Sequence, residues 1–297
     1  MAARLIDGKA IAEQINAETA LEVARLKVPH HLTPGLAVIL VGDNPASVAY
    51  VGSKDKMCAR LGLHSERIIL PATTSQGDLL AIVNDLNFKP SIHGILVQSP
   101  LPAQISEEAI FAAIDPSKDV DGFHPLNVGK LALGDPTGFA PCTPAGVHEL
   151  LVRSGVAVEG AHVVVLGRSR IVGRPVSLIL SQKNKTANAT VTVAHSRSHD
   201  LAGVCRSADI LVAAIGVPRF VRAEMVRDGA VVIDVGINRV EDKTAEKGYR
   251  LVGDVDFDAV KEKAALITPV PGGVGPMTIA MLMHNTVRAA KRRHGLV

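Results

Sequence analysis

Aromatic residues are scarce in this 297-residue sequence, which has no tryptophan, two tyrosines and six phenylalanines. Proteins that stack nucleic-acid bases depend on aromatic side chains. The 32 basic and 29 acidic residues leave a net charge of only +3, too small for electrostatic attraction to a nucleic acid. The basic cluster within 288–293 ends a predicted helix, where positive charge complements the helix dipole. We therefore expect no nucleic-acid partner.

Cysteines and long apolar runs are also few. The three cysteines, Cys58, Cys142 and Cys205, are widely separated and odd in number, which argues against a disulfide framework and against a metal site. The apolar run 210–217 is far shorter than the roughly 20 residues that span a bilayer. The N-terminus lacks the apolar block of a signal peptide. These absences predict a cytoplasmic protein with reduced thiols, no metal and no membrane association.

Short runs of valine, isoleucine and leucine alternate with longer helical patterns. Continuous apolar runs of strand length are typical of a parallel sheet that is covered on both faces, so the predicted fold class is α/β. The predicted strands are 36–41, 92–97, 163–166, 210–215 and 231–235.

Proline, glycine and aspartate are frequent between Asp115 and Pro144, which predicts an active-site loop and an interdomain connection. Two domains are expected, 1–144 and 145–276, and the last helix, from Met277 onward to residue 297, is expected to pack back on the first. This arrangement predicts two lobes with a cleft between them. Asn44-Pro45 is predicted to begin one helix and Thr143-Pro144 another, with Gly62 and Gly155 as their ends.

The segment 163–176 has the pattern of a dinucleotide-binding turn. A buried strand leads into Gly167 and Gly173, and a helix is predicted to start at Pro175. Glycines let the backbone approach a pyrophosphate, and a helix N-terminus offers free N–H groups. Ser169 replaces the middle glycine of the usual pattern, so an ordinary strand–helix turn remains an alternative.

The next predicted strand, 190–194, indicates which dinucleotide binds. It ends in His195, Ser196 and Arg197, where an enzyme that uses NAD would carry an aspartate or glutamate for the ribose. Arg168, Ser196 and Arg197 offer donors to a 2′-phosphate. The sequence therefore favours NADP over NAD, with solvated loop residues as the alternative.

Polar residues of the first domain form a second candidate site. Ser47, Tyr50 and Lys54 share one face of a predicted helix. Gln98 follows a buried strand, where open α/β sheets place ligands, and Asp121 lies in the connecting segment. Each has a simpler interpretation: a packed ring, a solvated lysine, a loop cap or a turn carboxylate.

Seven motifs in order resemble one family. They are Tyr50-x-x-x-Lys54, Val97-Gln-Ser-Pro-Leu-Pro102, Lys118-Asp-Val-Asp-Gly-Phe-His-Pro125, Pro141-Cys-Thr-Pro144, Gly167-Arg-Ser-x-Ile-Val-Gly173, Asp234-Val-Gly-Ile-Asn238 and Pro269-Val-Pro-Gly-Gly-Val-Gly-Pro-Met-Thr278. Together they resemble the bifunctional methylenetetrahydrofolate dehydrogenase/methenyltetrahydrofolate cyclohydrolase family over nearly the whole chain. The resemblance implies a folate-binding lobe, a Rossmann-like lobe that binds NADP, a homodimer, and a role in one-carbon metabolism and purine biosynthesis.

The resemblance also implies the site residues. Lys54 is the family's catalytic lysine, and its chemistry needs a neutral amine, which burial and the absence of a nearby carboxylate are expected to favour. Gln98 is expected to hydrogen-bond and orient Lys54, Tyr50 to contact the folate rings, and Asp121 to accept from the pterin. The further expected contacts are Ser47, Pro271, Gly272 and Gly273 for the substrate, and Gly167, Arg168, Ser169, Gly173, Ser196, Arg197 and Ile237 for the cofactor.

The sequence departs from the family pattern in one place and leaves two alternatives. The loop 181–189 is longer than expected, which puts the contacts at the phosphate end in question. The chain length also predicts no synthetase extension. The alternatives are a shikimate-type NADP dehydrogenase of a small hydroxy acid and a folate-binding homologue without catalysis.

Overall fold

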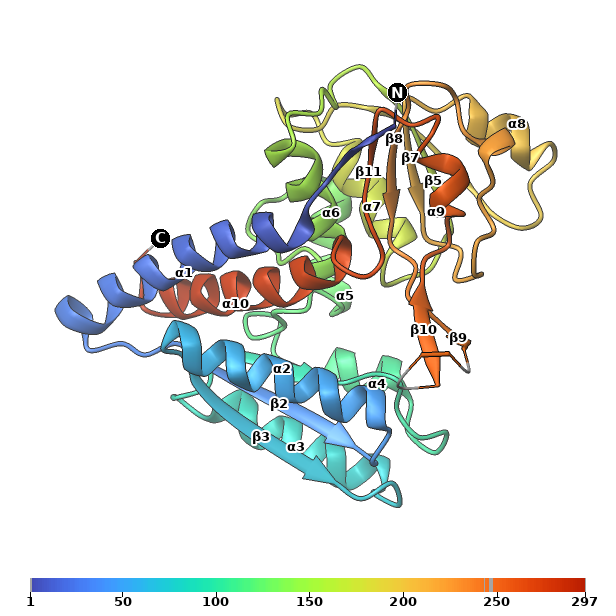
Figure 1. Cartoon of the computed structure of the whole chain (residues 1–297). Coiled ribbons are helices and arrows are strands. Elements are labelled where there is room, and N and C mark those ends of the chain that lie inside the picture. The colour runs from blue at the N-terminus through green and yellow to red at the C-terminus, as the bar shows by residue number, and fades with distance from the viewer. Residues whose placement is uncertain (1, 243, 246–247, 297) are drawn as a thin grey trace. The chain divides into compact units, whose positions relative to one another are not determined.

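The computed structural model describes residues 2–242, 244–245 and 248–296, and the chain divides into two compact units. The six-stranded unit contains Met1–Ala12 and Thr143–Thr278, and the three-stranded unit contains Glu13–Cys142 and Ile279–Val297. Each unit is built on its own parallel sheet (Figure 1). Three helices, α1 (Gly8–His30), α6 (Cys142–Arg153) and α10 (Val274–Arg293), contain residues of both units.

The sheet of the three-stranded unit has the order β3-β2-β4. Its strands are β2 (Gly35–Val41), β3 (His64–Leu70) and β4 (Gly94–Val97), and both neighbours pair with β2 in parallel. Every residue of β2 and β4 is buried. The helices of the unit are α2 (Pro45–Leu61), α3 (Gln76–Phe88), α4 (Glu107–Ala113) and α5 (Pro125–Leu133).

One face of this sheet is covered by α3 and α4. Leu79 and Val83 of α3 and Ile110 of α4 form one hydrophobic cluster with Ile39 of β2 and Ile95 of β4. All five are fully buried, so the continuous apolar runs of the sequence correspond to strands with helices packed against them. The carboxyl ends of β2 and β4 are therefore held by a rigid core.

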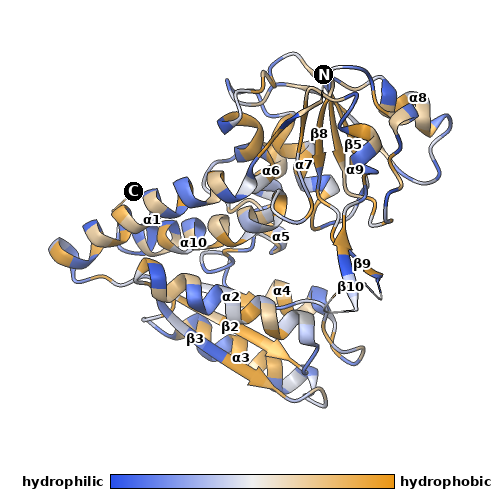
Figure 2. Cartoon of the chain, viewed as in Figure 1, coloured by the Kyte–Doolittle hydropathy of each residue, from blue (hydrophilic) through white to orange (hydrophobic). Residues whose placement is uncertain are grey.

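The sheet of the six-stranded unit has the order β1-β11-β8-β7-β5-β6. Every adjacent pair is parallel, and Figure 2 shows hydrophobic residues concentrated in its central strands. The strands are β1 (Arg4–Leu5), β5 (His162–Leu166), β6 (Thr190–Ala194), β7 (Ile210–Ala213), β8 (Val231–Asp234) and β11 (Leu266–Ile267).

Five helical segments and one hairpin complete this unit. Residues of α8 and α9 share one hydrophobic cluster with the sheet, and α7 packs on β5 and β6. The hairpin is antiparallel. The elements are α6 (Cys142–Arg153), α7 (Gly173–Leu180), α8 (Leu201–Arg206), the 3₁₀ helix η1 (Ala223–Met225), α9 (Phe257–Val260), β9 (Asn238–Glu241) and β10 (Tyr249–Val252).

The predicted α/β class and parallel strands are confirmed. The five predicted runs correspond to β2, β4, β5, β7 and β8, although β2 and β5 begin one residue before the predicted run, β4 begins two residues after it starts, and β7 and β8 end one or two residues before it ends. The helix predicted from Asn44-Pro45 is α2, in which the Asn44 side chain accepts from the Ser47 N–H at 3.3 Å. Gly62 follows the last residue of this helix with a φ of 78°, a conformation that glycine adopts without strain.

Four local predictions need correction. The helix expected to begin at Thr143-Pro144 begins at Cys142, and the one expected at Pro175 begins at Gly173. The last helix begins at Val274, three residues before the predicted Met277. Residues 1–12 cluster with the six-stranded unit rather than with residues 13–142, because β1 pairs with β11.

The stretch 115–144 is more ordered than a connecting loop. It contains α5, whose first turn is capped by His124 through a 3.0 Å bond from the Leu126 N–H to Nδ1. Gly134 ends the helix in the left-handed conformation, with a φ of 71°. The long loop 181–189 is also compact, because Asn188 and Ala189 donate backbone bonds to Gln182 and Leu180.

No helix among the described residues is both long and apolar enough to span a bilayer. The same residues contain no group of three or more histidine, cysteine, aspartate or glutamate side chains placed to hold a metal ion.

Candidate active site and dinucleotide-binding loop

Lys54 is the centre of the candidate active site in the three-stranded unit. It lies on α2, and its side chain is buried, with 2% of its surface exposed. The expected hydrogen bond with Gln98 is present, at 2.7 Å from Nζ to Oε1. Gln98 directly follows β4, so the end of that strand fixes the position of the amide.

Tyr50 and Asp121 complete this group. Tyr50 is one turn before Lys54 on α2, and the ammonium nitrogen lies 4.4 Å from the centre of its ring. Asp121 interacts electrostatically with Lys54. The four predicted residues from three separate motifs therefore meet at one place. Ser47 is buried one turn before Tyr50, and its backbone N–H is bound to Asn44.

The electrostatics of this group differ from the expectation for Lys54. Burial lowers the pKa of Lys54 to about 8, but Asp121 and Cys142 act in the opposite direction. The predicted absence of a nearby carboxylate is therefore wrong. Burial raises the pKa of Asp121 to about 6, against the attraction of the Lys54 charge. The pKa of the buried Lys54 and that of the half-buried Asp121 therefore lie closer together than those of a free lysine and a free aspartate.

Sequence reasoning missed the residues that hold Asp121. The Cys142 thiol, which acts on the pKa of Asp121, donates to the carbonyl of the preceding Val120 at 3.3 Å, and Asn285 of α10 donates to the same carbonyl at 2.9 Å. Asp119 is buried and accepts bonds from the backbone of Phe123 and His124. The Pro141-Cys-Thr-Pro144 motif contained the signal for Cys142, whereas nothing local in the sequence connects Asn285 to this loop.

The six-stranded unit carries the predicted dinucleotide-binding turn. Gly167 follows β5 with a φ of 131°, and a Cβ there would lie 2.1 Å from the Ala214 carbonyl oxygen. A Cβ on Gly173 would lie 2.2 Å from the Gly167 carbonyl oxygen. Only glycine fits at these two positions, so the backbone forms an open turn that a phosphate group can approach.

The side chain of Ser169 lies at the start of α7. Its Oγ accepts from the backbone N–H groups of Val172 and Gly173, at 3.1 and 3.4 Å. This makes Ser169 a cap of the helix, a role that differs from direct contact with a ligand. The other N–H groups of this first turn are also used, because Arg174 donates to the Ser169 carbonyl at 3.1 Å and Pro175 has no N–H. The positive end of the helix dipole is therefore what suits a pyrophosphate here.

The candidate 2′-phosphate donors come from two neighbouring strands. Leu166 of β5 and Ala194 of β6 are paired in the sheet, and Arg168, Ser196 and Arg197 follow these strand ends as exposed residues. The guanidinium groups of Arg168 and Arg197 have no hydrogen-bond or ion-pair partner within the described part of the chain. They are available to a phosphate group, and the turn and its donors fit a phosphorylated dinucleotide.

The other predicted contacts of this unit lie in separate loops. Ile237 is 59% exposed and precedes β9. Pro271, Gly272 and Gly273 lie between β11 and α10. Gly273 is packed so closely that a Cβ there would lie 2.6 Å from the Pro269 carbonyl oxygen. The structure places these four residues in the six-stranded unit, whereas Lys54 and its partners belong to the other.

These observations define a two-unit α/β protein with a dinucleotide-binding turn in one unit and a buried lysine site in the other. The chain matches two family profiles: the catalytic domain of tetrahydrofolate dehydrogenase/cyclohydrolase over residues 6–121, and the NAD(P)-binding domain of the same family over residues 141–294. The chain belongs to the tetrahydrofolate dehydrogenase/cyclohydrolase family.

Individual relatives agree with this assignment. Bifunctional protein FolD of Dehalococcoides mccartyi is 57% identical over all 297 residues of both chains. The crystal structure of the bifunctional FolD enzyme of Campylobacter jejuni has a TM-score of 0.92 and 49% identity, and covers 98% of this chain and all of its own. The Trypanosoma brucei FolD structure, a complex with NADP and an inhibitor, has a TM-score of 0.93 and 44% identity over 99% of each chain.

Proposed function

We propose that this chain oxidises 5,10-methylenetetrahydrofolate with NADP and then hydrolyses the product to 10-formyltetrahydrofolate. The first step transfers a hydride from the one-carbon unit to the nicotinamide, giving the 5,10-methenyl cation and NADPH. The second step adds water to that cation, releases a proton and opens the ring. The observation that carries the proposal is the group in which the buried Lys54 meets the half-buried side chains of Gln98 and Asp121, within the unit that matches the family's catalytic domain.

The three-stranded unit binds the folate in this proposal. Asp121 accepts from the adjacent N–H donors of the pterin, for which a carboxylate is well suited. Tyr50 contacts the folate rings, and Ser47 is a weaker contact. Lys54 handles the proton of the attacking water, because burial lowers its pKa to about 8 and a fraction of the amine is neutral at working pH. Gln98 acts through Lys54 by fixing the direction of its ammonium group.

The six-stranded unit binds NADP, which supplies the hydride acceptor. Gly167 and Gly173 leave room for the pyrophosphate at the start of α7. Arg168, Ser196 and Arg197 bind the 2′-phosphate, and Ile237 contacts the dinucleotide. Pro271, Gly272 and Gly273 contact the substrate. Hydride transfer depends on the proximity and orientation of two rings, so it requires no acid or base from the chain.

The proposed domain division follows these roles: residues 13–142 and the end of α10 serve folate, and residues 143–278 serve NADP except for the turn 271–273, which contacts the substrate. The family resemblance further supports a cytoplasmic homodimer that contributes to purine biosynthesis. Sedimentation of the purified chain tests the dimer, since a single species at the mass of one chain would contradict it.

A spectroscopic assay tests the activity. Purified protein is mixed with 5,10-methylenetetrahydrofolate and NADP or NAD, and reduced nicotinamide and the methenyl chromophore are followed together. We expect reduction of NADP with little methenyl accumulation, and hydrolysis of added methenyl substrate faster than in buffer. Persistent methenyl would restrict the chain to dehydrogenation. Absence of reduction with either cofactor would favour the homologue without catalysis.

A further inference from the structure

A cavity of about 910 Å³ opens in the three-stranded unit, away from the Lys54 group. It is lined by the ends of α3, α4 and α10, by the loop that leads to Lys118, and by α5. His93 lines it and immediately precedes β4, whereas Gln98 immediately follows that strand. These two positions are five residue steps apart along extended chain, a distance of about 16 Å. The cavity is large enough for a small organic ligand.

Positive charge predominates in the lining. Four cationic side chains contribute to the cavity wall, Lys118, Lys130, Arg292 and Arg293, against the single carboxylate of Asp115. Oδ1 of Asp115 already accepts from both the backbone and the hydroxyl of Ser117. The described lining is therefore a site of strong positive potential.

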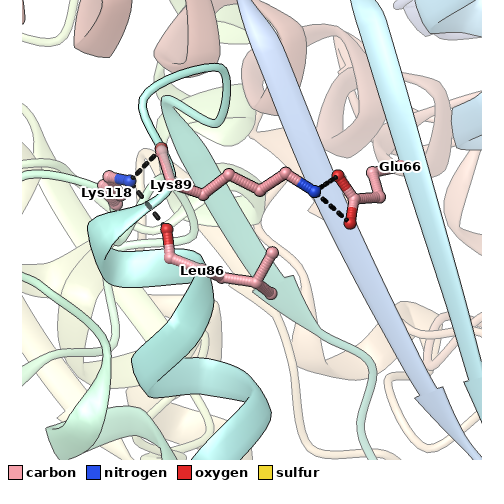
Figure 3. Close-up of polar contacts among 4 residues, drawn as sticks. All are labelled: Glu66, Leu86, Lys89 and Lys118. Carbon is pink, nitrogen blue, oxygen red and sulfur yellow. Dashed lines mark hydrogen bonds and ion pairs between the residues drawn. The ribbon is translucent and has the colours of Figure 1, made fainter.

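Lys118 is a buried cation that forms no ion pair with the described residues, although the charge of Asp115 acts on it. Only 1% of its surface is exposed, and its ammonium donates to the carbonyl oxygens of Leu86 and Lys89, at 2.7 and 2.9 Å (Figure 3). Two of its three donors are used in this way, and no carboxylate of the described chain lies within ion-pair distance of it. The Lys89 side chain points away from Lys118 and pairs with the carboxylate of Glu66 (Figure 3). A buried charge is costly unless it is paired.

His93 supplies a second buried donor without a partner. Its Nδ1 accepts from the Gly35 backbone N–H at 3.0 Å, so the proton of the neutral ring is on Nε2. The Nε2 atom is buried and has no hydrogen-bond partner among the described residues. Burial and the charges of His294, Arg293 and Lys118 lower the pKa of His93 to about 4. The ring is therefore neutral near pH 7, and it presents an N–H donor rather than a charge.

Two large apolar side chains of the lining are exposed. Phe88 ends α3 with 77% of its surface exposed, and Leu126 of α5 is 51% exposed. Both line the cavity. Large exposed apolar side chains beside a basic pocket suit a ligand that has an apolar body as well as a charged head.

We propose that this cavity binds a phosphate monoester of a small molecule with an apolar or aromatic body. The terminal phosphate oxygens accept from His93 Nε2, from the Lys118 ammonium and from the guanidinium of Arg293, and Lys130 adds charge. A phosphate group offers three acceptor oxygens, which matches several converging donors better than one carboxylate does. The apolar body lies against Phe88 and Leu126.

Calorimetric titration of the full chain with phenyl phosphate tests this site. The protein is first saturated with NADP so that the dinucleotide site is occupied, and ionic strength is held constant with chloride. We expect saturable binding of one phenyl phosphate per chain, with succinate binding at least 10-fold more weakly. An absence of binding, or equal affinity for succinate, would overturn the assignment.

Two variants with the same loss of charge locate the ligand. Lys130→Gln with Arg293→Gln removes two charges from the cavity and should weaken binding at least 10-fold. Lys27→Gln with Arg222→Gln removes two exposed charges elsewhere and should leave binding unchanged. Equal binding by the first variant and the wild type would place the phosphate outside the cavity.

Nuclear magnetic resonance of the unmodified protein supplies a readout that does not depend on variant folding. The ¹⁵N resonance of His93 Nε2 should shift as phenyl phosphate saturates the protein, because the nitrogen acquires an acceptor. The imidazole of the exposed His31 serves as the control. Saturation without any change at His93 would contradict the proposed contact.

Discussion

Lys54 and Gln98 are joined by a 2.7 Å hydrogen bond between Nζ and Oε1. The amide is itself oriented, because its Nε2 donates to the Ser99 carbonyl at 2.7 Å. An amide oxygen binds the ammonium without bringing the full negative charge that would raise the lysine pKa. Gln98 therefore holds the Lys54 side chain in place, while burial lowers the pKa of Lys54 to about 8.

Replacement of Gln98 by glutamate should raise the Lys54 pKa. If the neutral amine is the active form, cyclohydrolase activity rises as pH increases through about 8, and in Gln98→Glu this rise moves upward by about one pH unit or more. The measurement is kcat for ring opening between pH 6 and 10, with the rate in buffer subtracted. Gln104→Glu introduces the same charge at an exposed position and should leave the profile in place. An unchanged profile in Gln98→Glu would argue against the amine as the titrating group.

Asp121 should control folate binding at acidic pH. Burial raises its pKa to about 6, so the carboxylate is ionised above that pH and protonated below it. KM for the folate should rise as pH falls through about 6. In Asp121→Asn, KM should be raised about 10-fold or more at every pH, and the acidic change should disappear. The exposed Asp85→Asn is the control. If KM for the folate still rose in Asp121→Asn as the pH fell through about 6, Asp121 would be excluded as the titrating group.

Asp119 should be important for stability. It is buried and accepts from the Phe123 and His124 backbone and from Asn127 Nδ2, at 3.1, 2.8 and 2.8 Å. Asp119→Ala leaves these donors without partners, which should cost about 2–4 kcal/mol. Urea unfolding, followed by the transition of the three-stranded unit, measures this loss in the free energy of unfolding. The control Asp85→Ala should change that free energy by less than about 0.5 kcal/mol. Equal midpoints for the two variants would show that these bonds are dispensable.

The preference for NADP should depend on Arg168. Its guanidinium is exposed and has no partner in the described structure, and loss of a charge-assisted contact with phosphate costs about 1.5–3 kcal/mol. Arg168→Ala should therefore reduce the ratio of kcat/KM for NADP to that for NAD by about 10- to 100-fold. Arg170→Ala, two residues further along the loop, should change it much less. The same ratio in Arg168→Ala and wild type would leave Ser196 and Arg197 as the phosphate ligands.

The sequence predicts the strands well because they are buried on both faces. Continuous apolar runs such as 36–41 need no knowledge of their neighbours to be recognised. Short edge elements are not recognisable in this way. Strand β1 has two residues, and only its pairing with β11 shows that it belongs to a sheet. The helix α5 was missed although His124-Pro125 and Gly134 mark its two ends.

The residues that carry the chemistry of the candidate site were predictable from the sequence one by one. Lys54, Gln98 and Asp121 each lie in a short motif, and the structure brings them together. The error on the charge around Lys54 has a physical cause, because 67 residues of chain separate it from Asp121 and no local pattern reports their approach. The cavity beside Lys118 and His93 was unpredictable for the same reason, since its walls come from four helices and a loop.

The role of Lys54 is tested most directly by measuring both activities of Lys54→Ala in parallel with those of Lys56→Ala. Lys56 is exposed on the same helix and outside the buried group. We expect Lys54→Ala to bind folate while its rate of methenyl hydrolysis falls to that in buffer, and Lys56→Ala to retain both activities. Ring opening by Lys54→Ala at the wild-type rate would contradict the assignment of Lys54 as the group that handles the proton.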